Sequence, residues 1–244
     1  EAIVAGLKGL SVYPPTAGEP RLREAFTGWL QRRYGLALDP ATQVLPVGGS
    51  REALFAIAQT VIDPTRPGAT VVCPNPFYQI YEGAALLAGA EPVFLNTVPH
   101  NDFEMDWAAL PESTWRDVQL VYVCSPANPT GKVMDLAAWK TLFELSDRHG
   151  FVIASDECYS EIYTRQAPGS ALECAGPDFA NVVAFQSLSK RSNLPGMRVG
   201  FAAGDRKFLG AFHEFRNVAA PQVPVPLQHV AVAAYRDETH VEEN

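Results

Sequence analysis

The chain has 244 residues, of which 47% are hydrophobic and 19% charged, and its formal net charge is −8 at pH 7. This composition is typical of a globular protein with one large core, and its acidity argues against nucleic acid or an anionic membrane as the main partner because both bind basic surfaces. No apolar stretch approaches the ~20 residues that span a bilayer and the amino-terminal sequence does not resemble a signal peptide, so we expect a cytoplasmic protein.

The first predicted element is a helix from Arg21 to Tyr34, which Gly35 would end. A loop that begins at Tyr13 and reads Tyr-Pro-Pro-Thr-Ala-Gly-Glu-Pro leads into it. Later in the chain, Asp135 is expected to cap a second helix that ends at residue 150.

Short apolar, β-branched runs alternate with helical patterns along the rest of the chain. These runs are Thr70–Cys73, Pro92–Leu95, Gln119–Val123, Phe151–Ser155, Val182–Gln186 and Val199–Ala203. Together with a strand before Gly48, they predict a seven-stranded, mostly parallel sheet covered by helices on both sides, which is a three-layer α/β/α sandwich. Only about a dozen residues precede the last run, too few for a helical crossover, so its strand should run antiparallel and make the sheet mixed.

The four cysteines, at positions 73, 124, 158 and 174, are widely spaced and form no C-x-x-C pair. Three of them lie in or beside the predicted strands. We therefore expect reduced thiols, with neither a disulfide nor a metal site.

The most informative stretch follows the Val182–Gln186 run and reads Ser-Leu-Ser-Lys-Arg-Ser-Asn-Leu-Pro-Gly-Met-Arg from Ser187 to Arg198. It places Lys190 between hydroxyl groups and an arginine. A lysine that attacks a carbonyl needs a partly desolvated setting of low charge, whereas hydroxyls and arginine bind phosphate. The combination suggests pyridoxal phosphate as the ligand, and a solvated surface lysine is the alternative interpretation.

A glycine-rich turn at Gly48 and Gly49 is expected to join a strand to a helix that reaches Ile62. Backbone N–H groups at a helix N-terminus bind anions, and Ser50 can add its hydroxyl. Alternatively, Ser50 serves only as the helix cap.

Polar or aromatic side chains also follow three other strands. Tyr78 can stack on a flat heterocycle, while Phe77 and Tyr81 are assigned to packing. Asn128 precedes a proline, which holds it extended and directs its amide, although Asn-Pro-Thr-Gly is also a common turn. Asp156 leaves a buried strand, where a carboxylate is costly without a partner; a cap for the following turn is the other interpretation.

In order and spacing, these motifs resemble those of the class I/II aminotransferases of fold type I, which use pyridoxal 5′-phosphate. The resemblance implies that Lys190 binds the cofactor covalently and then transfers a proton, and that Asp156 keeps the ring nitrogen protonated. It also implies that Asn128 and Tyr159 contact the phenolic oxygen and that Tyr78 covers the ring.

The same resemblance assigns the phosphate to two segments and suggests a second subunit. The implied phosphate-binding residues are Gly49, Ser50, Arg51, Ser187 and Arg198. In the family, the residue corresponding to Tyr13 reaches the phosphate of the neighbouring subunit, which implies a homodimer. Residues 1–40 would then form a dimer-contact arm with its helix.

The amino-acid sequences of these motifs are most similar to those of bacterial N-succinyldiaminopimelate aminotransferases of lysine biosynthesis. This similarity implies glutamate as the amino donor and an oxo acid or amino-ketone as the acceptor. Carbon–sulfur β-lyases and aspartate- or alanine-type aminotransferases share the same residues. A noncatalytic binding or dimerisation domain is the alternative from another class.

The resemblance also divides the chain. Residues 41–222 would form the cofactor-binding large domain, and residues 223–244 the start of a helix that leads to a carboxyl-terminal small domain, after a break at Pro221, Pro224 and Pro226. The family binds the substrate carboxylate with an arginine of that small domain. Since the chain begins with Glu1 and ends in a polar run, we expect a piece of a longer protein that is poorly active by itself.

Overall fold

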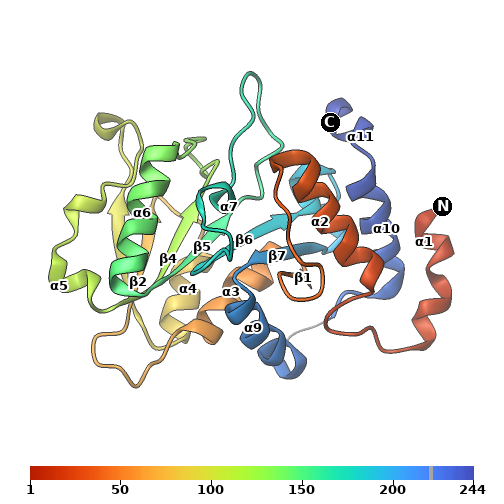
Figure 1. Cartoon of the computed structure of the whole chain (residues 1–244), viewed down its shortest axis with the longest axis horizontal. Helices are drawn as coiled ribbons and strands as arrows, with labels where there is room; N and C mark the ends of the chain where they lie inside the picture. The colour runs from red at the N-terminus through yellow and green to blue at the C-terminus, as the bar shows by residue number, and fades with distance from the viewer. Residues whose placement is uncertain (220–221) are drawn as a thin grey trace.

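Seven strands form one sheet at the centre of the structure, a computed structural model that describes residues 1–219 and 222–244 (Figure 1). The strands are β1 (Val44–Val47), β2 (Thr70–Asn75), β3 (Glu91–Asn96), β4 (Val118–Cys124), β5 (Val152–Asp156), β6 (Val182–Ser187) and β7 (Gly200–Gly204). Their order across the sheet is β1-β7-β6-β5-β4-β2-β3. Pairing is parallel from β3 to β6, whereas β7 is antiparallel to both β6 and β1. The predicted mixed sheet is confirmed, including the direction of its last strand.

Helices cover both faces of this sheet, as its apolar strands require. The longer helices are α2 (Pro20–Tyr34), α3 (Ser50–Val61), α4 (Ile80–Leu87), α6 (Leu136–His149), α9 (Arg206–Ala219) and α10 (Val225–Arg236). One face packs against α2, α6 and α10 in a cluster of buried apolar side chains, and the other face packs against α3, α4 and α9 in a second cluster (Figure 1). The predicted sandwich is therefore observed.

Shorter helices complete the described part of the chain. They are α1 (Ala2–Ala5), η1 (Leu7–Ser11), η2 (Pro99–Asn101), η3 (Trp107–Ala109), α5 (Glu112–Trp115), α7 (Ala171–Cys174), α8 (Leu188–Arg191), η4 (Pro195–Met197) and α11 (Thr239–Glu243). Among the described residues, no helix is long and apolar enough to cross a membrane.

The predicted helix boundaries are explained by their capping residues. The Asp135 carboxylate accepts a 2.8 Å hydrogen bond from the Ala138 N–H at the start of α6, and Gly150 ends that helix with a positive φ of 78°. Gly35 ends α2 in the same way, with φ 72°. Three of the four thiols, those of Cys73, Cys124 and Cys158, are buried in or beside the strands, as expected.

The amino-terminal segment packs on the carboxyl-terminal helices rather than on the sheet. Helix α10 contacts α2, and both α1 and η1 contact α10, so that the two chain ends lie on the same side of the molecule (Figure 1). This segment leaves an exposed apolar strip, which consists of Ile3, Val4, Leu7, Leu10, Val12 and Tyr13. Of the predicted break before α10, Pro224 and Pro226 are described, whereas Pro221 lies outside the described residues.

Candidate functional site

A cavity of about 450 Å³ lies at the edge of the sheet that the carboxyl ends of its parallel strands form. Its lining residues are Ser50, Arg51, Tyr78, Asn128, Asp156, Cys158, Tyr159, Ser189, Lys190, Pro195 and Arg198. The parallel strands β1, β2, β4, β5 and β6 all end at this edge, and the antiparallel β7 begins there, so loops far apart in sequence meet. Topology therefore gathers most of the residues that the motifs singled out.

Asp156 is the most deeply buried polar residue of the cavity, with 5% of its surface exposed. Its Oδ2 atom accepts a 2.8 Å hydrogen bond from the Tyr81 hydroxyl, and its Oδ1 atom accepts a longer one of 3.3 Å from the Cys158 N–H. Burial raises the pKa of the Asp156 carboxyl above its ordinary value, and these hydrogen bonds oppose the rise. No salt bridge among the described residues involves Asp156, so a cationic ligand group would relieve the cost of burying it.

Tyr81, which the sequence analysis assigns to packing, has a second role. Its ring does pack, stacked on Tyr122 with the centroids 4.7 Å apart, but its hydroxyl reaches Asp156. The assignment of Tyr81 to packing is confirmed, and the hydrogen bond to Asp156 is an additional role. Because its partner lies 75 positions away in sequence, no local pattern indicates this contact.

Lys190 lies in α8, directly after β6, and its side chain is exposed. Its Nζ atom is 5.6 Å from the centre of the Tyr159 ring. Burial raises the pKa of the Tyr159 hydroxyl, so this group remains a hydrogen-bond donor at neutral pH. A primary amine and a phenolic donor thus line the same cavity.

The two serines before Lys190 have different positions. Ser187 caps α8, where its Oγ atom accepts a 3.0 Å hydrogen bond from the Ser189 N–H, and its hydroxyl donates to the Ser189 Oγ atom at 2.8 Å. Ser189 lines the cavity, whereas Ser187 lies behind it. The motif predicts Ser187 alone as a phosphate contact, although the Ser-x-Ser pattern contains both serines.

The glycine turn lies against Arg198, which lines the cavity. Gly49 is the N-cap of α3 with φ 92°, and a Cβ atom placed on it would overlap the Arg198 guanidinium. Arg198 donates from Nη1 to the Pro195 carbonyl at 2.9 Å and from Nη2 to the Gly48 carbonyl at 3.3 Å, and it remains exposed. Its other N–H groups and the start of α3 are thus available to an anion.

The remaining predicted positions are placed as follows. Ser50 is the first residue of α3, not its cap, so the interpretation of Ser50 as the cap is wrong. The Arg51 guanidinium lies 5.8 Å from the centre of the Tyr78 ring, which is half-buried at the cavity wall. Asn128 is exposed at the mouth. Tyr13 is fully exposed and does not line this cavity.

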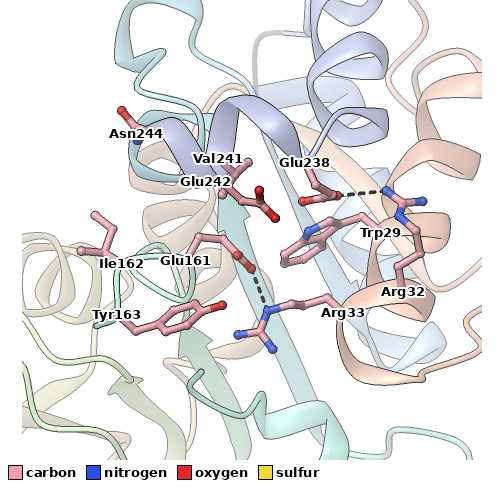
Figure 2. Close-up of a pocket in the computed structure, with 10 residues that line it drawn as sticks. All are labelled: Trp29, Arg32, Arg33, Glu161, Ile162, Tyr163, Glu238, Val241, Glu242 and Asn244. Carbon is pink, nitrogen blue, oxygen red and sulfur yellow. Dashed lines mark hydrogen bonds and ion pairs between the residues drawn. The ribbon is translucent and has the colours of Figure 1, made fainter. Parts of the chain in front are cut away.

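A larger cavity of about 630 Å³ lies between α2, α11 and the segment after β5 (Figure 2). Four of its charged groups already pair with one another: Arg33 with Glu161 at 3.0 Å and Arg32 with Glu238 at 3.2 Å. It contains no lysine and none of the predicted site residues. We therefore identify the smaller cavity as the candidate active site.

Comparisons with known proteins show the family of the chain. A family model described as aminotransferase class I and II matches residues 5–244, so the chain belongs to the class I/II aminotransferases, a family that depends on pyridoxal phosphate. The chain is 34% identical over 223 residues to an LL-diaminopimelate aminotransferase from Dehalococcoides mccartyi, covering 91% of this chain and 56% of that protein. The predicted family is thus confirmed.

Several solved structures are similar over 99% of this chain, including one from Neisseria meningitidis and one from Thermus thermophilus. An aminotransferase from Neisseria meningitidis is 48% identical with a TM-score of 0.96, and this chain covers 63% of it. A probable N-succinyldiaminopimelate aminotransferase from Thermus thermophilus is 26% identical with a TM-score of 0.90, and this chain covers 65% of it. The chain therefore spans less than two thirds of the length of each of these relatives.

Proposed function

We propose that this cavity binds pyridoxal phosphate and that the protein transfers amino groups between an amino acid and an oxo acid. The observation that carries the proposal is the convergence of Lys190, Asp156, Asn128 and Arg198 on one cavity of 450 Å³. They come from three parts of the chain: Asn128 follows β4, Asp156 ends β5, and Lys190 and Arg198 both lie between β6 and β7. An amine, a buried carboxylate, an amide and a guanidinium match the aldehyde, ring nitrogen, phenolic oxygen and phosphate of this cofactor.

The phosphate fits the wall where the glycine turn meets Arg198. Gly49 lacks the Cβ that would displace the Arg198 guanidinium from this wall, and the first turn of α3 presents N–H groups beside the hydroxyl of Ser50. Arg198 would hold the phosphate with those of its N–H groups that do not donate to the carbonyls of Pro195 and Gly48. Arg51 and Ser189 line the same cavity. Ser187 supports this wall through its bonds to Ser189.

The ring fits between Tyr78 and the end of β5. Asp156 would accept a hydrogen bond from the protonated ring nitrogen, which gives the buried carboxylate a cationic partner. Asn128 and Tyr159 would donate to the phenolic oxygen, and Tyr78 would stack on the ring.

When bound, pyridoxal phosphate supplies a ring that accepts the electron pair released from the substrate Cα–H bond. The protein's part is to hold the ring and to move the proton. Lys190 would carry the cofactor at rest and, once the substrate amine displaces it, would act as the base that takes the proton from Cα. Asp156 would keep the ring nitrogen protonated throughout.

Borohydride reduction followed by peptide mapping tests this proposal. Reduction of the protein mixed with pyridoxal phosphate should fix the label on Lys190, and Lys190→Ala should lose it. Lys132 is the matched control site, at which no label is expected. It lines another small cavity beside Asn128, but its amine is already held in ion pairs with Asp102 and Glu104. A single defined label that persists in Lys190→Ala would disprove the assignment.

For the substrate, we propose glutamate as amino donor and N-succinyl-2-amino-6-oxopimelate as acceptor. Two similarities support a diaminopimelate-type substrate: the relative from Dehalococcoides mccartyi is named for LL-diaminopimelate, and the solved structure from Thermus thermophilus for the N-succinyl form. The two names differ by the succinyl group, so it is the feature to test.

The substrate test compares turnover of N-succinyl-LL-diaminopimelate and free LL-diaminopimelate with 2-oxoglutarate in the full-length protein. Faster turnover of the succinylated compound supports the proposal. Preference for the free diamino acid, or for pyruvate or oxaloacetate as acceptor, would reject the substrate and leave aminotransfer intact. Elimination from cysteine-type substrates at a higher rate than transamination would instead indicate a β-lyase.

We also propose that the protein is a homodimer in which Tyr13 reaches the site of the second subunit. The support is the full exposure of Tyr13 at the end of an exposed apolar strip. Such a strip on a surface commonly marks a protein–protein contact.

A further inference from the structure

A buried ion pair lies directly behind the glycine turn of the candidate site. Arg216 of α9 has only 1% of its side chain exposed and pairs with Glu52 in the first turn of α3. The other carboxylate oxygen of Glu52 accepts a 3.1 Å hydrogen bond from the Gly48 N–H. Helices α3 and α9 lie side by side on the same face of the sheet (Figure 1), so Arg216 reaches Glu52 from outside the site.

Glu52 compensates for the missing cap of α3. The N-cap is Gly49, which has no side chain that could accept hydrogen bonds from the free N–H groups of the first turn. In a capping box, a glutamate at the third helical position returns to the N–H of the N-cap residue. Glu52 occupies this position but reaches one residue further, to Gly48. It therefore fixes the turn from behind and leaves the first N–H groups of α3 free on the cavity side.

Gly48 joins this support to the cavity. Its N–H is held by Glu52, while its carbonyl accepts the 3.3 Å hydrogen bond from Arg198. Arg198 in turn lies against Gly49 so closely that no side chain fits there. A continuous series of contacts thus runs from Arg216 through Glu52 and Gly48 to the guanidinium at the cavity.

The charge of Arg216 is needed in this position. A carboxylate at the start of α3 favours the helix but repels a phosphate dianion at the same N-terminus. Arg216, which is not among the lining residues of the cavity, neutralises Glu52, so that the negative charge is compensated while the geometry is kept.

We propose that Glu52 and Arg216 are positioning residues for the phosphate: together they hold the Gly48–Gly49 turn, and through it Arg198, in the conformation that binds it. The inference rests on the proposed cofactor site. It predicts that disturbing the pair weakens binding of the phosphate and not of the ring.

The test compares pyridoxal 5′-phosphate with pyridoxal, which has the same ring and aldehyde but no phosphate. Each is titrated into the purified protein by absorbance, and the ratio of the two dissociation constants measures the contribution of the phosphate. Arg216→Met leaves the Glu52 carboxylate uncompensated, so the dissociation constant for pyridoxal phosphate should rise by about tenfold to a hundredfold, with little change for pyridoxal. Arg216→Lys keeps the charge and should restore part of this loss.

Glu52→Asp tests geometry at constant charge. The shorter side chain cannot reach both Gly48 and Arg216, so the preference for the phosphate should fall severalfold. Glu161→Asp is the matched control, because Glu161 forms an ion pair with Arg33, also at low exposure, outside the site (Figure 2). This control should reduce thermal stability without changing the preference for the phosphate.

The outcomes separate this inference from the proposed function. A wild-type protein that binds both compounds equally would reject the phosphate site itself. A wild-type preference for pyridoxal phosphate that survives in Glu52→Asp, or that changes equally in Glu161→Asp, would reject the positioning role alone. If Arg216→Met does not fold, as judged by its thermal transition, Glu52→Asp decides.

Discussion

Asp156 shows how one residue can be unfavourable for the fold and suited to the site. A carboxylate with 5% exposure loses its hydration, and one hydroxyl and one long amide contact replace only part of it. Its pKa is raised for this reason. A protonated ring nitrogen would reverse that shift, because an opposite charge nearby favours the ionised carboxylate.

Asp156→Asn should preserve the fold and the covalent attachment of the cofactor, because the amide is isosteric. It should lower kcat by roughly a hundredfold or more, since a neutral amide cannot keep the ring nitrogen protonated at the transition state, while KM changes little. Steady-state kinetics of the full-length protein with glutamate measure both constants. An unchanged kcat would exclude the proposed role.

Gly49→Ala should weaken cofactor binding at least tenfold. The substitution adds a methyl group where Arg198 lies and places a non-glycine residue at φ 92°, a conformation that costs about 1–3 kcal/mol. Gly35→Ala is the control, because Gly35 also has a positive φ of 72° but has no atom within 4 Å of an added Cβ. Gly35→Ala should lower the thermal midpoint only; equal cofactor affinities in the two variants would contradict the contact with Arg198.

Local motifs predicted individual site residues well where a strand end identifies the position. Asp156 ends one apolar strand and Asn128 follows another, so their place at the sheet edge follows from the pattern alone. Tyr81 and Arg216 could not be recognised, because their roles depend on tertiary contacts.

At the scale of elements, a second buried carboxylate connects the end of β5 to its neighbours. The Oε1 atom of Glu157 accepts hydrogen bonds from the hydroxyls of Ser155 and Ser170 and from the Ala171 N–H, and its Oε2 atom accepts one from Gln186. These contacts connect the end of β5 to β6 and α7, directly after the site residue Asp156.

Glu157 should make stability depend on pH. Burial raises its pKa from 4.5 to about 7, although its hydrogen bonds oppose the rise. The folded state therefore binds the proton more tightly than the unfolded chain. This stabilising contribution is complete below pH 4.5 and is lost as the pH rises through about 7.

Glu157→Gln should flatten this dependence, because the amide does not ionise. Urea unfolding at a series of pH values measures the free energy of unfolding for both proteins. Glu173→Gln, at an exposed position of α7, is the control and should keep the wild-type slope. Equal slopes for wild type and Glu157→Gln would show that Glu157 does not titrate in this range.

The elements themselves were accessible to prediction from sequence because local signals mark them. β-branched runs mark the strands, while Asp135 and the terminal glycines mark the helix ends. The order of the strands was not predicted, since β1 pairs with β7 through contacts between distant parts of the chain. The small helices around the loops also lack a clear local pattern.

At the scale of the whole molecule, the exposed strip on α1 and η1 should be the contact between subunits. Leu10→Asp places a charge where Leu10 is 66% exposed and should shift the protein from dimer to monomer. Sedimentation velocity measures the change. Leu87→Asp, at a leucine 72% exposed on α4, should remain dimeric. A monomeric wild type, or a dimeric Leu10→Asp, would contradict the proposed interface.

The pairing of β1 with β7 also has a consequence for synthesis on the ribosome. Val47 pairs with Gly200, 153 positions later (200 minus 47), so β1 cannot join the sheet until most of the chain has been translated. At about 5–20 residues per second, this delay is roughly 8–30 seconds. During that time the strands from β2 to β6 can pair, while β1 and the apolar side of α2 lack their final partners. We therefore expect the nascent chain to depend on chaperones that shield its amino-terminal quarter until β7 and α10 emerge.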